Sequence, residues 1–293
     1  MIVSSNSRSF LQEKSTLVLN GKIIDLTSPK VMGILNVGPD SFFDGGQYLN
    51  EENITTHVHQ MVNEGVDVID IGAVSTRPGA AQPSCKEELK RLLPAVKLVR
   101  GLYPEIPISI DTYRSWVVQR VVDEVGEVIV NDISGGSFDE QMYQTVAKLG
   151  VPYILMHLVG TDNNHIHKTP EYNDLIKDIF KFFSERVRKL HQLGVKDVIL
   201  DPGFGFGKTL DNNYELLNRL DAFKVFQLPM LVGVSRKSMF YKLLETTPEN
   251  SLAATISANT LALLGGANIL RVHDVKEAVH CVKIFNKLKE ISK

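Results

Sequence analysis

Four polar residues in the sequence are of types that could hold a flat, polar ring. Asp111 and Asp201 can accept hydrogen bonds, Asn131 can both donate and accept, and Lys237 can donate. Each amine or carbonyl of a buried heterocycle needs one such partner. Two plainer interpretations stay open, namely a helix cap at Asp111 and the start of a turn at Asp201.

A second group of residues is basic. Arg236 and Lys237 are adjacent, and Arg271 lies two residues before His273. A planar arginine fork together with a histidine is typical of a clamp for phosphate or pyrophosphate. A solvated basic loop is the alternative.

The elements that must position these residues follow a regular pattern along the chain. Eight short runs are rich in β-branched residues, and longer stretches with helical apolar spacing separate them, residues 174–193 being the clearest. The runs are residues 31–36, 66–71, 106–110, 128–131, 153–156, 198–200, 230–234 and 269–272. Continuous apolar runs of this kind predict a parallel sheet buried on both faces.

The helices between the runs carry recognisable start and stop signals. Ser84 and Glu87 have the spacing of a capping box. Thr247-Pro248 predicts the start of a helix over residues 249–264, and Gly265-Gly266 predicts its end.

The number and order of the elements predict the fold class. About 250 residues is the usual size of an eightfold (β/α) TIM barrel. A doubly wound sheet would need a G-x-G-x-x-G pattern after its first strand, and residues 38–46 lack it. We therefore predict an α/β TIM barrel with an N-terminal β-hairpin around Asn20-Gly21. Residues 1–14 are predicted to be a flexible tail, and residues 15–293 a single domain.

A polar residue follows every predicted strand. In chain order these are Asn36, Ser75-Thr76-Arg77, Asp111, Asn131-Asp132, His157, Asp201, Ser235-Arg236-Lys237, and Arg271 with His273. In TIM barrels the chemistry sits at these carboxyl ends, and phosphate sites are frequently built from the loops after strands seven and eight. We therefore expect one site at this end of the barrel.

Composition excludes several functional classes. The 293 residues include 32 Lys and Arg against 34 Asp and Glu, so the net charge of −2 gives no basic excess for nucleic acid. We find neither an apolar run long enough to span a membrane nor a signal peptide, and we expect a cytoplasmic protein. Cys85 and Cys281 fit no metal spacing and are predicted to be free thiols.

Two patterns suggest other sites and are set aside. The segment Gly203-Phe-Gly-Phe-Gly-Lys-Thr209 looks like a phosphate-binding P-loop, but the first required glycine falls on Pro202. Its glycines instead predict a bent loop that presents Phe204 and Phe206 to the site mouth. His165 and His167, with His157, lack the Cys or Glu partners of a zinc site.

Several segments together resemble the dihydropteroate synthase family of pterin-binding enzymes. They are Gly33-Ile-Leu-Asn-Val-Gly-Pro-Asp-Ser-Phe42, Ser75-Thr-Arg-Pro-Gly-Ala80, Ser109-Ile-Asp-Thr112, Val130-Asn-Asp-Ile133, Leu155-Met-His157, Leu200-Asp-Pro-Gly-Phe-Gly-Phe-Gly-Lys208, Gly233-Val-Ser-Arg-Lys-Ser238 and Arg271-Val-His-Asp274. They occur in family order over about nine-tenths of the chain. The sequence departs from the family at Gly38, usually Thr, and at Val74, often Glu.

The resemblance implies a reaction and a set of site residues. The family joins 6-hydroxymethyl-7,8-dihydropterin diphosphate to p-aminobenzoate in folate biosynthesis, and sulfonamides inhibit it as mimics of p-aminobenzoate. By resemblance the pterin is held by Asp111, Asn131, Met156, Asp201 and Lys237. The diphosphate is held by Asn36, Arg271 and His273, with Asn36 as the protein ligand of Mg²⁺. The p-aminobenzoate pocket is built by Ser75, Thr76, Arg77, Pro78, Phe206 and Ser238. The catalytic set is Asn36, Arg77, Lys237, Arg271 and His273.

This implied chemistry agrees with the residue types. The reaction needs no protein nucleophile, because the aryl amine attacks. Mg²⁺ prefers oxygen ligands and phosphates, so one neutral Asn36 oxygen is a sensible protein ligand. The family resemblance also favours a homodimer, for which the small residues Ala253, Ala254, Ser257 and Ala258 leave room for close helix packing; packing within one subunit is the alternative.

Three alternative functions would need different sets of site residues. A pterin-binding methyltransferase, which passes a methyl group to a corrinoid, would keep the Asp and Asn residues but would not need the diphosphate clamp. A non-catalytic pterin-binding homologue would not need Asn36, Thr76 and Arg77. A sugar-phosphate isomerase would need a Glu or Lys base at the strand ends, for which we find no well-placed candidate.

Overall fold

The computed structural model describes residues 15–38, 46–74, 82–160 and 168–291. Within these ranges the strands are β1 (Thr16–Leu19), β2 (Lys22–Asp25), β3 (Lys30–Asn36), β4 (Val68–Gly72), β5 (Ile108–Asp111), β6 (Ile129–Asp132), β7 (Tyr153–Met156), β8 (Val198–Asp201), β9 (Leu231–Val232) and β10 (Ile269–Val272). The eight runs predicted from the sequence correspond to β3–β10, with ends that differ by no more than two residues.

The helices alternate with the strands along the chain. They are α2 (Gly46–Glu64), α3 (Cys85–Leu102), α4 (Ser115–Val125), α5 (Met142–Leu149), α6 (Leu175–Gln192), α7 (Leu210–Asn218), α8 (Ser238–Leu243), α9 (Leu252–Gly265) and α10 (Val275–Ile291), with short 3₁₀ segments at Leu220–Phe226 and Glu249–Ser251. In the part of the chain that is described, no helix is long and apolar enough to cross a membrane.

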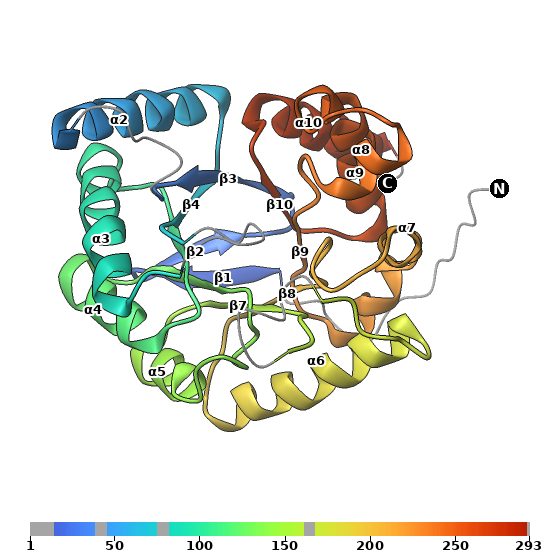
Figure 1. Cartoon of the computed structure of the whole chain (residues 1–293), viewed down its shortest axis with the longest axis horizontal. Coiled ribbons are helices and arrows are strands. Elements are labelled where there is room, and N and C mark those ends of the chain that lie inside the picture. Colours follow the sequence, from blue (N-terminus) through green and yellow to red (C-terminus); the bar gives the residue numbers. More distant parts are fainter. Residues whose placement is uncertain (1–14, 39–45, 75–81, 161–167, 292–293) are drawn as a thin grey trace.

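Strands β3–β10 form one parallel sheet that nearly closes on itself. Its order is β8-β7-β6-β5-β4-β3-β10-β9. A parallel bridge pairs Leu200 with Met230, and the Leu200 N–H donates to the Pro229 carbonyl at 2.8 Å, which brings β8 beside β9. Figure 1 shows the helices arranged around this ring in sequence order. The predicted TIM barrel is confirmed.

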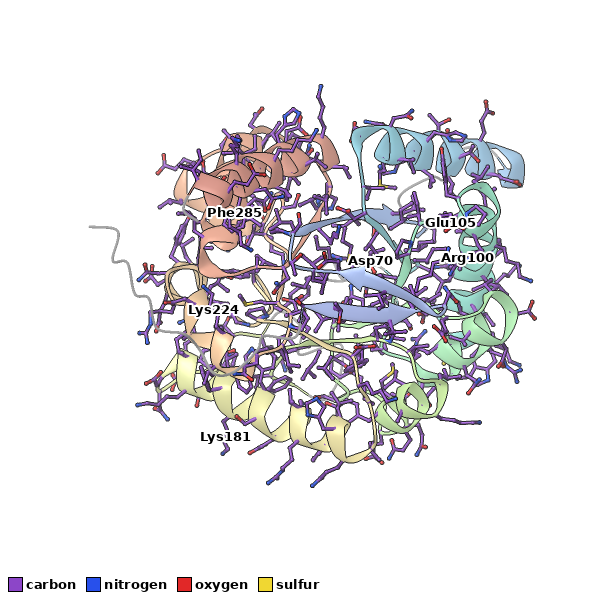
Figure 2. The ribbon with its side chains drawn as sticks, turned by 180° about the vertical axis from the view of Figure 1, so that it is seen from behind. Asp70, Arg100, Glu105, Lys181, Lys224 and Phe285 are labelled. Atoms are coloured by element: carbon purple, nitrogen blue, oxygen red, sulfur yellow. The ribbon has the colours of Figure 1, made fainter. Side chains whose placement is uncertain are left out.

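Burial on both faces explains why these strands lack a polar–apolar alternation. Every residue of β4, β6, β7 and β8 is buried, since the interior and the surrounding helices each cover one face. The helices cover the outer face of the sheet with buried apolar residues. On α6, Ile179 and Phe183 are buried, whereas Lys181 points outward (Figure 2).

The predicted hairpin β1–β2 closes the amino end of the barrel. Asn20 and Gly21 both have positive φ, as a two-residue turn of this kind requires. Leu17 and Leu19 are buried and belong to one cluster with Met32, Ile154 and other residues from the barrel interior. The hairpin is held there by the Val18 N–H, which donates to the Asp197 carboxylate at 3.2 Å. The carboxyl end of the barrel is left for a site.

The helix signals are confirmed with one correction. The Ser84–Glu87 capping box is present at the start of α3. The helix predicted over residues 249–264 instead starts with a 3₁₀ turn, and α9 begins at Leu252. It ends as predicted, with Gly266 in a left-handed conformation. Cys85 and Cys281 are both free.

Candidate active site

Strand register places three predicted site residues at one level of the barrel. Asn36 pairs with Gly72, Gly72 with Asp111, and Asp111 with Asn131. Gly72 provides the space between them, because a Cβ there would lie 3.3 Å from the Asp111 Cβ. Asn36, Asp111 and Asn131 therefore lie on the same rim of the sheet, at the carboxyl end.

Arg271 joins this rim to a buried acid that the sequence analysis missed. Arg271 donates from Nε to Asp70 Oδ2 at 2.7 Å and from Nη2 to Asp111 Oδ2 at 2.8 Å. The Asn131 amide donates to the same Asp70 oxygen at 3.0 Å. Figure 2 shows Asp70 inside the barrel. An acid inside the apolar run Val68-Ile-Asp-Ile71 was the available signal, because a buried charge needs a partner.

Burial and charge act against each other in this network. Burial raises the pKa of Asp111 to about 7, and Arg271 opposes that rise. Burial alone would lower the pKa of Arg271, but Asp70 and Asp111 outweigh it and hold the pKa above the ordinary value. Arg271 is therefore a permanent cation. Asp70 Oδ1 is buried without a hydrogen-bond partner among the described residues.

Asp201 and Lys237 form a second part of the same rim. Asp201 pairs in register with Met156, and its Oδ1 accepts from the Gly203 N–H at 2.8 Å. Lys237 Nζ donates to the Phe204 carbonyl and lies 4.3 Å from the centroid of the Phe206 ring. Burial raises the pKa of Asp201, and it lowers the pKa of Lys237 to about 8 with Asp201 opposing.

The two parts share one electrostatic environment. Arg271 acts on the pKa of both Asp111 and Asp201, and Asp111 acts on that of Lys237. The structure thus brings together two acids, a lysine and an arginine that are widely separated in the sequence. Pairs of titratable groups with opposed shifts in one place are typical of functional sites.

Two members of the predicted basic clamp behave differently from expectation. Arg236 makes a two-pronged ion pair with Asp274, at 3.0 Å from Nε and 2.6 Å from Nη2. Its guanidinium is paired with Asp274 in this structure, and its role in a phosphate clamp stays a prediction. His273 Nδ1 lies 3.1 Å from Ser235 Oγ. Burial, then Arg271, lowers the pKa of His273 to about 4, so the ring is neutral at pH 7 and can offer hydrogen bonds but no charge.

The two phenylalanines of the glycine-rich loop lie in different surroundings. Phe204 is fully buried in the main core, so the expectation that it faces the site mouth was wrong. Phe206 is partly buried against a small cluster that includes Met156 and Leu158. Ser238 begins α8, directly after Lys237. Phe206 and Met156 therefore supply the apolar wall beside the polar rim.

Some predicted residues lie outside the described part of the chain. These are Ser75, Thr76, Arg77 and Pro78, together with His165, His167 and the tail at residues 1–14.

The metal prediction depends on Asn36. The side chain of Asn36 is exposed at the end of β3. Among the described residues, no group of three or more His, Cys, Asp or Glu could hold a metal ion. A single oxygen from Asn36 fits Mg²⁺, which commonly takes one or two protein oxygens and completes its shell with substrate phosphates and water.

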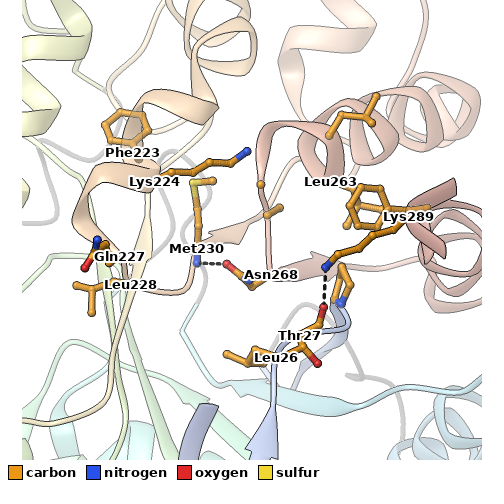
Figure 3. A pocket seen from close by; sticks show the side chains of 15 residues that line it. Leu26, Thr27, Phe223, Lys224, Gln227, Leu228, Met230, Leu263, Asn268 and Lys289 are labelled. Carbon is orange, nitrogen blue, oxygen red and sulfur yellow. Dashed lines mark hydrogen bonds between the residues drawn. The ribbon is translucent and has the colours of Figure 1, made fainter. Parts of the chain in front are cut away.

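A separate pocket of about 240 Å³ lies at the opposite end of the barrel (Figure 3). Its wall includes Met230, whose N–H donates to Asn268 at 2.9 Å, and Thr27, whose carbonyl accepts from Lys289 at 3.1 Å. These residues precede strands or flank the hairpin, so the pocket is at the amino end, away from the polar rim.

Comparisons with known proteins agree with this geometry. The family model described as "Pterin binding enzyme" matches residues 32–273. The chain is 41% identical over 270 residues to the dihydropteroate synthase of Escherichia coli, covering 92% of this chain and 94% of the relative. It is 42% identical over 264 residues to that of Synechocystis, covering 88% and 89%.

Solved structures extend the likeness to three dimensions. A Yersinia pestis dihydropteroate synthase in a sulfonamide drug complex is 39% identical with a TM-score of 0.86, covering 94% of this chain and 99% of that one. A Xanthomonas albilineans dihydropteroate synthase with 4-aminobenzoic acid is 34% identical, also with a TM-score of 0.86, covering 94% and 98%. The chain belongs to the dihydropteroate synthases, transferases of the pterin-binding enzyme family.

Proposed function

We propose that the polar rim joins 6-hydroxymethyl-7,8-dihydropterin diphosphate to p-aminobenzoate, giving 7,8-dihydropteroate and pyrophosphate. The observation that carries the proposal is the convergence of Asp111, Asp201 and Arg271 at the carboxyl end of the barrel, in a chain related to dihydropteroate synthases over most of its length. The aryl amine attacks the pterin methylene carbon, the carbon–oxygen bond breaks, and the diphosphate leaves.

In this proposal the pterin contacts four residues of the polar rim and has Met156 beside it. The four residues are Asp111, Asn131, Asp201 and Lys237. Carboxylate oxygens accept from ring amines, and Lys237 donates to a ring acceptor. The unpaired Asp70 oxygen supports this placement, since a buried acceptor costs free energy until a donor reaches it.

The diphosphate would be held by Asn36, His273 and Arg271. Negative charge grows on the leaving oxygen as the bond breaks, so donors fixed in advance stabilise the transition state more than the ground state. Asn36 would provide the protein oxygen for Mg²⁺, which when bound would neutralise part of the diphosphate charge. Neutral His273 would donate from Nε2 in the tautomer in which its Nδ1 accepts from the Ser235 hydroxyl.

The p-aminobenzoate would bind between Phe206, Ser238 and the segment Ser75–Pro78. Phe206 supports this part of the proposal because its ring is partly buried between Lys237 and the Met156 cluster. The Xanthomonas relative crystallised with 4-aminobenzoic acid gives the ligand class.

We also infer that the chain is a cytoplasmic homodimer. The outward face of α9 supports a subunit contact: Ala253 and Ser257 are exposed there, together with Leu261 and Leu264 at 53% and 59% exposure. Ala258, in contrast, is buried within the subunit, so the small residues serve both kinds of packing.

The reaction is tested by incubating the purified chain with dihydropterin diphosphate, p-aminobenzoate and Mg²⁺. Dihydropteroate and pyrophosphate should appear in equal amounts, and both should require p-aminobenzoate. Transfer of a methyl group from methyltetrahydrofolate to a corrinoid would instead identify the rival methyltransferase. Pterin binding without turnover would identify a non-catalytic homologue.

A further inference from the structure

Lys208 is a buried lysine beside the active site that the proposed reaction does not use, and burial lowers its pKa to about 7, with Asp201 opposing. Only 8% of its surface is exposed. Its ammonium group lies 2.8 Å from the Gly203 carbonyl, 3.1 Å from the Phe206 carbonyl and 3.1 Å from His157 Nδ1. Three acceptors around Nζ match the three N–H donors of a protonated lysine.

His157 is suited to be the third acceptor. It is 1% exposed and lies edge-on to Phe182, with ring centroids 4.9 Å apart. Burial, then Lys208 and Arg186, holds the pKa of His157 well below its ordinary value. The ring is therefore neutral, and its Nδ1 can accept from Lys208 while Nε2 carries the proton.

The segment between these contacts has a conformation that turns its carbonyls in different directions. Gly203, Gly205 and Gly207 all have positive φ, with non-glycine residues between them. Gly203 also passes so close to the end of β7 that a Cβ would lie 2.3 Å from the His157 carbonyl. In this path the carbonyls of Gly203 and Phe206 face Lys208, whereas the carbonyl of Phe204 faces Lys237.

The loop therefore contacts the Nζ atoms of two buried lysines. Lys237, on one side, takes the Phe204 carbonyl and faces the Phe206 ring. Lys208, on the other side, takes the carbonyl of Phe206 itself. The Phe206 backbone is thus fixed by one lysine and its ring by the other.

We propose that Lys208 is a positioning residue that sets the place of Phe206 and so selects the aryl amine substrate. Lys208 Nζ is engaged by two backbone carbonyls and His157, so in this proposal it acts on the substrate through Phe206. Because Phe206 belongs to the p-aminobenzoate pocket only under the proposed function, this inference rests on that function. Asp201 keeps its own bond to the Gly203 N–H when Lys208 is replaced, so we expect the geometry of the pterin side to persist. Lys208 also acts on the pKa of Asp201, and K208R is the variant that keeps this charge.

The test replaces Lys208 in the full-length enzyme by Met, Gln and Arg. Met removes every donor, Gln keeps an uncharged pair of N–H donors, and Arg keeps a cation. We expect the KM for p-aminobenzoate to rise at least tenfold in K208M and K208Q and less in K208R. The Kd for dihydropterin diphosphate, measured by calorimetry, should change less than threefold in all of them.

A matched control uses another anchor of the same loop. The Tyr172 hydroxyl donates to the Gly207 carbonyl at 3.0 Å, one residue after Phe206. Y172F should change the KM for p-aminobenzoate less than twofold. An equal rise in Y172F and K208Q would show that any loosening of the loop suffices, and would overturn a specific role for Lys208.

The remaining outcomes are also decisive. An unchanged KM in K208Q, or a parallel loss of pterin affinity, would overturn the inference, as would failure of all three Lys208 variants to fold. If the unmodified enzyme forms no dihydropteroate, the proposed function fails instead, so the two failures are distinguishable.

Discussion

Arg271 connects two acids of different depth in the barrel. Its contacts with Asp70 and Asp111 make it a structural partner as well as a candidate ligand for the diphosphate. Removing Arg271 takes away the ion-pair partner that the two carboxylates share, and uncompensated buried charge is costly.

We therefore expect R271A to lower the free energy of unfolding by about 3–5 kcal/mol and turnover at least tenfold. R271K keeps the charge but lacks the fork that reaches both acids. Its stability should therefore lie between that of R271A and that of the unmodified protein. Urea unfolding and steady-state kinetics measure these effects. An R271A variant as stable as the unmodified protein would contradict the bridging role.

Asp201 is expected to bind the pterin only by accepting hydrogen bonds at its carboxylate oxygens. In D201N one oxygen becomes an N–H donor that faces ring amines, so the Kd for dihydropterin diphosphate should rise about 10- to 100-fold. Calorimetry measures the Kd. D197N is the matched control, because Asp197 is also buried but lies at the amino end, where it holds the hairpin. Equal affinity in D201N and the unmodified protein would refute the role.

Deprotonation of Lys237 should weaken pterin binding at basic pH. Burial lowers its pKa to about 8, so the ammonium group loses its proton, and with it a donor and its attraction for Asp201, as the pH rises through 8. Calorimetry between pH 6 and 10 should show affinity falling above about pH 8. In K237R the guanidinium stays charged throughout. A fall that persists unchanged in K237R would assign the limit to another group.

At the residue scale, the sequence predicted the members of the rim better than their partners. Asp111, Asn131, Asp201 and Arg271 follow strands, and strand ends of a barrel must meet. Asp70 was missed because it lies inside an apolar run rather than after one. The pairing of Arg236 with Asp274 depends on side-chain direction, which spacing alone does not determine.

At the scale of the elements, the hairpin β1–β2 serves stability rather than chemistry. Leu17 is 1% exposed, whereas its neighbour Val18 is 49% exposed. L17A should lower the free energy of unfolding by about 2–5 kcal/mol, because it leaves a cavity under the barrel. V18A, the control, should change it by less than about 0.5 kcal/mol. Urea unfolding measures both; a change in the KM for either substrate in L17A would contradict the separation of roles.

The elements themselves were largely predictable, since burial on both faces leaves a continuous apolar run for each strand. The glycine-rich loop was less predictable. Its glycines indicated a bend, but the direction of each side chain depends on contacts with Lys208 and Lys237. Phe204 therefore turned out to lie in the core, opposite to expectation.

At the scale of the whole molecule, the barrel leaves the outward face of α9 apolar. If this face joins two subunits, a charge there should separate them, because an unpaired charge buried in an interface is costly. L264D should sediment as a monomer where the unmodified protein sediments as a dimer. L193D is the control, because Leu193 is exposed after α6. A dimer that survives L264D and L261D would contradict the proposed contact.

The central claim is that the carboxyl end of the barrel, and no other part of the described chain, holds the pterin. A crystal structure with dihydropterin diphosphate tests it most directly. We predict the pterin ring against Asp111, Asn131 and Asp201, with its diphosphate directed toward Asn36 and His273. A pterin bound at the amino end, in the pocket beside Met230, would contradict the account.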